Sequence, residues 1–406
     1  MNRSIAAALL ALLPASVPAQ KPVPRLYLAP ELTIAARQLN TAGNGGANSK
    51  GMIYVGPDGR ILYTMSYYGD VRFFDSLGKT MPVKVTLADR EGEIGWIEHA
   101  GWLGSMFWIS DPRFKQVVLL DGGGKIVKTM SYPTWVYPHW ADRRKYPLFA
   151  SMTVFGVYAD SSLLVRPERP RTLLDTPGFD KTASHLVRID KDGAVKRLIA
   201  TFDDDDGNLW LRGAGRSEHV MQAPVVSRSF WKVSGDGKRI VFVKPGTTAA
   251  DSGTFRVTSL NENGDTVFSR RYPMPVVRVN KKSVDSALAT VKAFGDNTAE
   301  DIRAKLAQKI PEFRSFVAGL VAGRDQSTWV MLRSMNDTSK TQSALILDER
   351  GEPLATVDVS EFVQPLVVDR THLWGTDRLK LSVVRMRLQA TAPPPDTTTV
   401  PVSERL

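Results

Sequence analysis

The sequence predicts an all-β protein built from repeated four-stranded units, and two observations support this fold class. First, five segments share one turn pattern, in which an apolar strand runs into Asp or Asn and a Gly follows three residues later. Second, the segments around these turns alternate between apolar and polar residues, a period typical of half-buried strands. The five turns lie at 75–78, 121–124, 190–193, 261–264 and 348–351.

Each of these turns has a physical basis as a hairpin. The Asp or Asn side chain can accept hydrogen bonds from the backbone two residues further on, and the Gly takes the positive-φ position that closes the turn. A single four-stranded unit cannot bury its own faces, so repeated units stack radially. We therefore predict a six-bladed β-propeller of four-stranded antiparallel blades.

The first five blades follow one another along the chain. In each blade, strand A is innermost and strand D is outermost, and four short strands fit into about 35 residues. Blade one begins at Met52, and its fourth strand is expected after Gly78. Blades two to five are expected at 98–130, 153–202, 228–272 and 316–359.

The sixth blade lacks one strand of its own. Only three strands are indicated, at 365–368, 372–375 and 381–388. An unpaired sheet edge leaves backbone donors and acceptors without partners, and residues 25–28 form a candidate strand near the N-terminus. We predict that this strand completes the last blade, so that the propeller covers residues 25–389. The segment 390–406 has little apolar content and is expected to be disordered.

Residues 1–19 have the pattern of a secretory signal peptide. Asn2 and Arg3 precede a short apolar run, and cleavage is expected after Ala19. That run is too short to span a bilayer, so we expect an exported periplasmic or extracellular monomer that is not membrane-spanning. The chain has no cysteine, which excludes a disulfide framework and a thiolate metal site. Its net charge of +11 is scattered, which favours anionic surfaces over nucleic acid as partners.

A helical insertion is expected at about 280–314, between blades four and five. Two short helices fit the sequence there, with Ser283 and Thr298 as candidate N-caps. Ile302, Leu306 and Ile310 recur at helical spacing. We predict that these three side chains pack on the ring of blades.

Several segments together resemble a known group of proteins. They are GPDGRIL at 56–62, VRFFDSLGK at 71–79, SMFWISDPR at 105–113, VLLD at 118–121, LWG at 373–375 and VVR at 383–385. In these segments the chain is similar to secreted bacterial six-bladed propellers related to the NHL and TolB-like families. The resemblance covers most of the chain after residue 19. It implies the fold and no particular activity, because fold alone does not determine chemistry.

Signatures of catalysis are scarce. The sequence has no Gly-x-Ser-x-Gly, His-Glu-x-x-His, P-loop or dinucleotide-binding motif, and its five histidines are spread over different segments. We therefore predict a noncatalytic binding protein with no catalytic, cofactor-binding or metal-ligating residues. Two alternatives remain open at this point. One is a hydrolase or lactonase that holds an axial metal with side chains from separate blades, and the other is an envelope scaffold protein.

The long connections between strands indicate where a ligand binds. They join strand D to strand A and strand B to strand C, two classes of connection that lie at the same end of the ring. Binding residues are often held on loops over a rigid scaffold, although such loops can also simply cover the channel mouth. The segment 132–146 mixes aromatic and cationic residues, which suits an acidic glycan, a small ligand or an envelope protein. The candidate binding residues are Trp135, His139, Trp140, Arg143, Arg144, His219 and Arg228.

Overall fold

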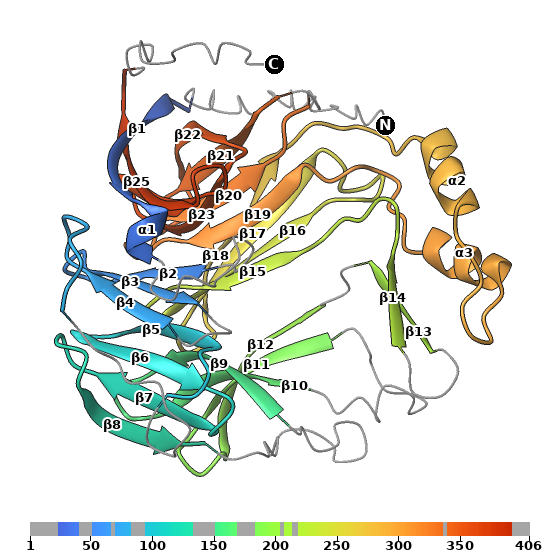
Figure 1. Ribbon diagram of the computed structural model, residues 1–406. Coiled ribbons are helices and arrows are strands. Elements are labelled where there is room, and N and C mark those ends of the chain that lie inside the picture. Colours follow the sequence, from blue (N-terminus) through green and yellow to red (C-terminus); the bar gives the residue numbers. More distant parts are fainter. Residues whose placement is uncertain are drawn as a thin grey trace, which may run out of the picture.

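The computed structural model of the chain has an all-β fold in which short sheets have a propeller-like arrangement (Figure 1). It describes residues 23–39, 51–65, 70–82, 94–132, 151–168, 183–203, 207–212, 218–335 and 339–391. The expected signal segment 1–19 and most of the expected disordered tail, from residue 392 on, lie outside the described residues.

The sheets are antiparallel meanders that follow the chain order. The first sheet has three strands in the described residues, β2 (Gly51–Val55), β3 (Ile61–Met65) and β4 (Asp70–Phe74). The second consists of β5 (His99–Leu103), β6 (Met106–Asp111), β7 (Gln116–Leu120) and β8 (Ile126–Ser131). The third consists of β9 (Ser151–Val157), β10 (Leu163–Glu168), β11 (Ala183–Ile189) and β12 (Val195–Asp203). The fourth consists of β15 (Phe230–Val233), β16 (Arg239–Pro245), β17 (Thr254–Asn261) and β18 (Thr266–Pro273).

The last part of the chain forms one continuous eight-stranded sheet with the N-terminal strand. Its first four strands are β19 (Val317–Ala322), β20 (Thr328–Leu332), β21 (Thr341–Leu347) and β22 (Pro353–Ser360). Next come β1 (Arg25–Ile34) and then β25 (Ser382–Gln389), β24 (His372–Asp377) and β23 (Val363–Val368). The short helix α1 (Ala36–Leu39) follows β1.

The turn mechanism predicted from the sequence is confirmed at all five sites. In each turn the Gly has a φ between 76° and 83° and donates its N–H to the carbonyl of the Asp or Asn three residues before it. The side chain of that Asp or Asn accepts hydrogen bonds from the second and the fourth following N–H. Only a residue without a Cβ adopts this φ readily, so the Gly is the restrictive position.

Apolar clusters join each sheet to a neighbour. One cluster places Trp108 of the second sheet against Val154 and Val187 of the third. Another packs Val243 and Phe255 of the fourth sheet against the fifth. The first strands of the sheets also contact one another, in the pairs β5–β9, β15–β19, β19–β23 and β2–β23. These contacts arrange the sheets around a common axis.

The N-terminal strand joins the two ends of the chain. The sequence predicts that residues 25–28 pair with the last strands, and in the structure β1 pairs antiparallel with β25 from Tyr27 to Ile34. At its start, β1 also pairs in parallel with β22, where Arg25 and Leu26 face Thr356 and Val357. Ile34 is buried with Trp374 and Val383 of the last strands and with residues of the first sheet.

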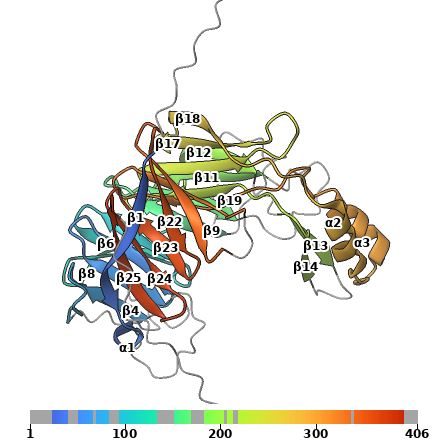
Figure 2. The same cartoon turned by 90° about the horizontal axis from the view of Figure 1, so that it is seen from above.

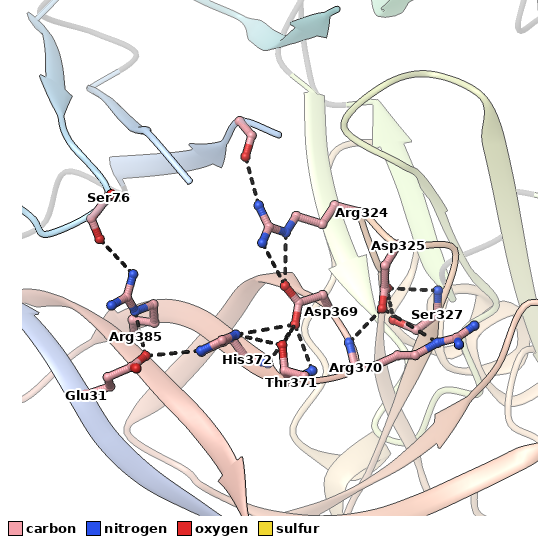
Figure 3. A network of polar contacts seen from close by, with 11 residues as sticks. Glu31, Ser76, Arg324, Asp325, Ser327, Asp369, Arg370, Thr371, His372 and Arg385 are labelled. Atoms are coloured by element: carbon pink, nitrogen blue, oxygen red, sulfur yellow. Dashed lines mark hydrogen bonds and ion pairs between the residues drawn. The ribbon is translucent and has the colours of Figure 1, made fainter. Parts of the chain in front are cut away.

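A polar network reinforces the contact of the N-terminal strand and the last strands with the first sheet (Figure 3). Glu31 of β1 lies 2.8 Å from Nε of Arg385 and 3.1 Å from Nε2 of His372. Arg385 donates a hydrogen bond to the carbonyl of Ser76 in the first sheet. Arg324, which follows β19, donates to Asp369 and to the carbonyl of Gly56. Charged side chains thus link the first sheet to both ends of the eight-stranded sheet, the β19–β22 part and the β23–β25 part.

Two elements form a separate projection from the ring (Figure 2). One is the hairpin of β13 (Asn208–Arg212) and β14 (Glu218–Gln222), which lies in the long connection between the expected third and fourth blades. The other is the helix pair α2 (Lys281–Ala289) and α3 (Ala299–Ala307), between β18 and β19 in the chain. Ile302, Leu306 and Ile310 pack together with Leu211 and Met221 of the hairpin. The prediction that they pack on the ring is therefore wrong, because the apolar face of the hairpin covers them instead.

The two helix starts differ in how well the sequence predicts them. Thr298 caps α3 as predicted, and its side-chain oxygen accepts a hydrogen bond from the N–H of Asp301. Ser283 does not cap α2, because Asn280 accepts the hydrogen bond from the N–H of Ser283 and begins the helix one turn earlier. Among the described helices, none is long and apolar enough to cross a membrane.

Candidate functional site

A cavity of about 1000 Å³ lies along the axis of the ring. It is lined mainly by six strands: β2, β5, β9 and β15, which are each the first strand of a sheet, and β19 and β23, which are the two edge strands of the eight-stranded sheet. Ligand pockets typically measure about 300–1000 Å³, so this cavity is at the upper end of the range for small molecules.

The polar residues of the cavity gather at one end. His99 opens β5, and Arg314 and Glu361 come just before β19 and β23. Lys232 is the third residue of the four-residue strand β15, and its charge acts on His99. Arg166 lies late in β10, and Arg333 and Arg378 follow β20 and β24. In an antiparallel sheet, the start of the first strand and the end of the second lie at the same edge. These residues therefore surround one mouth of the cavity, the mouth that the sequence analysis associates with the long connections.

Cations dominate this mouth. Arg166, Lys232, Arg314, Arg333 and Arg378 line it, and among the described lining residues Glu361 is the only carboxylate. The ammonium group of Lys232 and the guanidinium of Arg333 make no hydrogen bond or ion pair within the described part of the chain. A concave surface with charges of one sign raises the local concentration of oppositely charged ligands. This mouth therefore attracts anions.

Aromatic side chains support part of the cationic mouth. The rings of Phe155 and Trp231 meet edge to face, with their centroids 4.8 Å apart. The guanidinium carbon of Arg166 lies 5.9 Å from the first ring centre and 5.8 Å from the second. His99 is tilted against Phe155 with the ring centroids 4.7 Å apart. Four separate strands thus contribute to one aromatic and cationic cluster.

The cluster shifts the protonation of its own titratable groups. Burial, and after it the nearby charges of Lys232 and Arg166, lower the pKa of His99 to about 4. Desolvation also lowers the pKa of Lys232. Since both cations disfavour a further positive charge, His99 is neutral at neutral pH. A bound anion would remove part of this repulsion.

The opposite wall of the same mouth has a different character. It presents hydroxyl and amide groups from Ser334, Ser339, Thr341, Gln342 and Gln364. Nη2 of Arg378 donates a 3.0 Å hydrogen bond to Oε1 of Gln364, which holds both side chains in place. This wall offers neutral donors and acceptors to a ligand that contacts the aromatic cluster on the other side.

The structure describes two of the seven candidate residues that the sequence suggests. Trp135, His139, Trp140, Arg143 and Arg144 lie outside the described residues. His219 is in β14, where its ring centroid lies 4.9 Å from that of Phe294, beside a smaller pocket of about 330 Å³. Arg228 precedes β15 and is half-buried. Neither His219 nor Arg228 is among the described residues that line the axial cavity.

The cluster around Trp231 is not among the candidate residues predicted from the sequence. Two features of the sequence nevertheless point to it. Lys232 interrupts the apolar pattern of an innermost strand, and Phe155 occupies the equivalent strand of the preceding sheet. Within the described residues, no group of three His, Cys, Asp or Glu side chains is placed to hold a metal ion. The chemistry that this mouth supports is the binding of an anion against aromatic rings.

Comparison with known proteins gives weak similarities. No protein-family model matches the sequence, and no curated protein sequence matches it either. A solved structure of a DUF4221 family member from Bacteroides vulgatus is 11% identical, with a TM-score of 0.43 over 90% of this chain and 98% of that chain. Streptogramin B lyase is 9% identical, with a TM-score of 0.41 over 90% and 98%. The calcium-binding protein regucalcin from Agrobacterium tumefaciens is 10% identical, with a TM-score of 0.35 over 91% and 98%. At this level the similarities support no conclusion about activity or ligand.

Proposed function

We propose that the chain is an exported six-bladed β-propeller that binds an anionic ligand at the cationic mouth of its axial cavity. The six-blade count is supported by the six strands that mainly line the cavity and by the pairing of β1 with β25. The sequence resemblance places the protein with the NHL and TolB-like propellers in this proposal. An acidic glycan, a small acid and an acidic envelope protein all have the required charge.

One observation carries the binding proposal. Lys232 and Arg333 are cations that line the cavity and have no hydrogen-bonding or ionic partner in the described part of the chain. Both residues are exposed at the mouth of the cavity, so an anionic ligand can reach their side chains and form charge-assisted hydrogen bonds with them. The aromatic and cationic segment 132–146 stays a sequence-based proposal for the same face.

The first test removes these two charges. Each charge-assisted hydrogen bond contributes about 1.5–3 kcal/mol, so the Lys232→Ala, Arg333→Ala double variant should weaken anion binding by about a hundredfold or more. Calorimetric titrations with tetragalacturonate and with hexaglutamate measure the affinity, and binding of either probe supports the proposal. Added salt should weaken this binding as well.

The matched control has the same change in net charge at a distance from the cavity mouth. Lys191 and Arg350 are exposed residues of two Asp-Gly turns, at the opposite end of the blades. The Lys191→Ala, Arg350→Ala variant should bind as the unmodified chain does. If both double variants lose affinity equally, or if neither probe binds, the proposed function is wrong.

Export is a separate part of the proposal and has its own test. When the full chain is produced in a bacterial host, its product in the periplasm or medium should begin at Gln20, as N-terminal sequencing would show. A replacement of Leu9 and Leu10 by Asp interrupts the apolar run and should retain the full-length chain in the cytoplasm. Retention of the unmodified chain with its first 19 residues would contradict the proposal.

A further inference from the structure

We propose that His99, Phe155, Arg166, Trp231 and Lys232 form a subsite for an acidic sugar residue, a uronate unit of an oligosaccharide. This inference rests on the proposed function, because it assigns a ligand class to the same cationic mouth. The sugar ring lies against the aromatic side chains, and its carboxylate is bound by the two cations. The five residues come from four strands that belong to three sheets.

The aromatic surface is accessible to a ligand. Phe155 and Trp231 are only partly buried, although they pack on an apolar cluster between the third and fourth sheets. Phe202 packs against Trp231, with the ring centroids 5.0 Å apart. Partly exposed rings that such packing fixes in place provide rigid contact area at low entropic cost. The apolar C–H face of a sugar ring fits such a surface.

The charges are placed for a carboxylate beside these rings. The guanidinium of Arg166 lies close to both aromatic rings, which limits the positions it can take. A guanidinium can bind a carboxylate with two parallel hydrogen bonds. Lys232 is next to Trp231 in β15, so its side chain leaves the opposite face of that strand. It lines the same cavity, however, and its charge, like that of Arg166, acts on His99. The Lys232 ammonium has no partner in the described residues, and a neutral sugar would leave it without one.

The remaining cavity favours a sugar over an acidic peptide. The facing wall carries hydroxyl and amide groups, which can bind the hydroxyl groups of further sugar units. The volume of about 1000 Å³ leaves room beyond a single ring. An acidic peptide has the carboxylates but lacks the flat C–H faces that would use Phe155 and Trp231.

Proton uptake provides a specific readout of the subsite. The charged groups that face His99 are Lys232 of β15 and Arg166 of β10, and Glu98 precedes it in the chain. A carboxylate bound to the two cations weakens their repulsion of a positive charge on His99, and the pKa of His99 rises from about 4. Binding of tetragalacturonate at about pH 5 should therefore take up protons, seen as a dependence of the calorimetric enthalpy on buffer ionisation.

The experiment compares three probes and three variants of the full chain. Tetragalacturonate should bind at least about tenfold more tightly than hexaglutamate and at least about a hundredfold more tightly than neutral galactotetraose. Trp231→Leu should weaken tetragalacturonate binding about tenfold or more and change hexaglutamate binding little. Lys232→Gln should weaken the binding of both acids, whereas Lys238→Gln, in the turn between β15 and β16 and not part of the described cavity lining, should weaken neither. His99→Gln should abolish the proton uptake.

The outcomes separate this inference from the proposed function. If hexaglutamate binds as tightly as tetragalacturonate, or if Trp231→Leu folds and binds the sugar unchanged, the subsite is wrong while the anion site stands. If Lys232→Gln leaves the affinity for both acids unchanged, neither acid is held at this cluster and the subsite is again wrong. Proton uptake that persists in His99→Gln would contradict the assignment of the proton to that ring. Thermal melting of each variant checks that the fold is retained.

Discussion

An internal deletion of residues 25–34 should abolish cooperative unfolding of the protein. The deletion removes β1, which pairs with β25 over most of its length and with β22 at its start. Two strand edges are then left without partners, and the buried side chain of Ile34 is lost from the contact between the first and last sheets. The loss of one large core side chain alone costs about 2–5 kcal/mol, and whole domains are stable by only about 5–15 kcal/mol. Calorimetry and size-exclusion chromatography measure the outcome, and the exposed edges should make the deleted chain associate.

Two further measurements sharpen this prediction. A synthetic peptide of residues 23–35 should restore a cooperative transition when it is added to the deleted chain, because the site for β1 stays specific in sequence and register. Arg25→Ala serves as the control, since it removes only an exposed ion pair with Asp358 and should leave the melting temperature nearly unchanged. A deleted chain that melts like the full chain and stays monomeric would show that β1 is dispensable.

The architecture of the sheets could be predicted from the sequence because its signals are local. The turns at 75–78 and 348–351 carry both the acceptor side chain and the positive-φ Gly within four residues, and the structure shows both. The hairpin β13–β14 was missed, because it lies in a segment that begins with an acidic run and shows no such turn signal. Without that hairpin, Ile302 and Leu306 had no visible partner other than the ring. An apolar stripe indicates that a helix is covered but not which element covers it.

The residues of the binding mouth could be predicted only in part, because the signals that would bring them together are not local in the sequence. Strand alternation and connection lengths indicate the end of the ring at which polar residues gather. They do not indicate that His99, Phe155 and Trp231 meet, because these residues lie on three separate sheets and far apart in the chain. A segment with many aromatic and cationic residues, such as 132–146, draws attention in a sequence. A cluster assembled from single residues of separate strands becomes visible only in the folded chain.

Asp369→Ala should be among the most destabilising single substitutions outside the apolar core. The carboxylate of Asp369 is 5% exposed and accepts hydrogen bonds from the N–H groups of Thr371 and His372 and from the hydroxyl of Thr371. It also accepts one from Nε of Arg324, which in addition donates to the carbonyl of Gly56 and lies over the ring of Trp374. The substitution leaves a partly buried guanidinium and two N–H groups without their acceptor, which should cost about 3–5 kcal/mol. Chemical denaturation of the full chain and the variant gives this difference in unfolding free energy.

The carboxylate of Asp369 should also make the difference in unfolding free energy between the full chain and Asp369→Ala depend on pH. Burial by itself would raise the pKa of Asp369, but the hydrogen bonds from Thr371 and the nearby charge of Arg324 outweigh it and lower the pKa. A carboxylate with a lowered pKa in the folded state stabilises the protein above its unfolded pKa of about 3.9, and this contribution is lost as the pH falls through the folded value. The gap in unfolding free energy between the full chain and Asp369→Ala should therefore be constant near neutral pH and shrink below about pH 4. Asp377→Ala removes a more exposed turn acceptor from the next turn along the chain, between β24 and β25, and should cost about 1 kcal/mol or less. A gap that widens on acidification, or equal costs for both variants, would mean that Asp369 does not hold Arg324 across the closure of the ring.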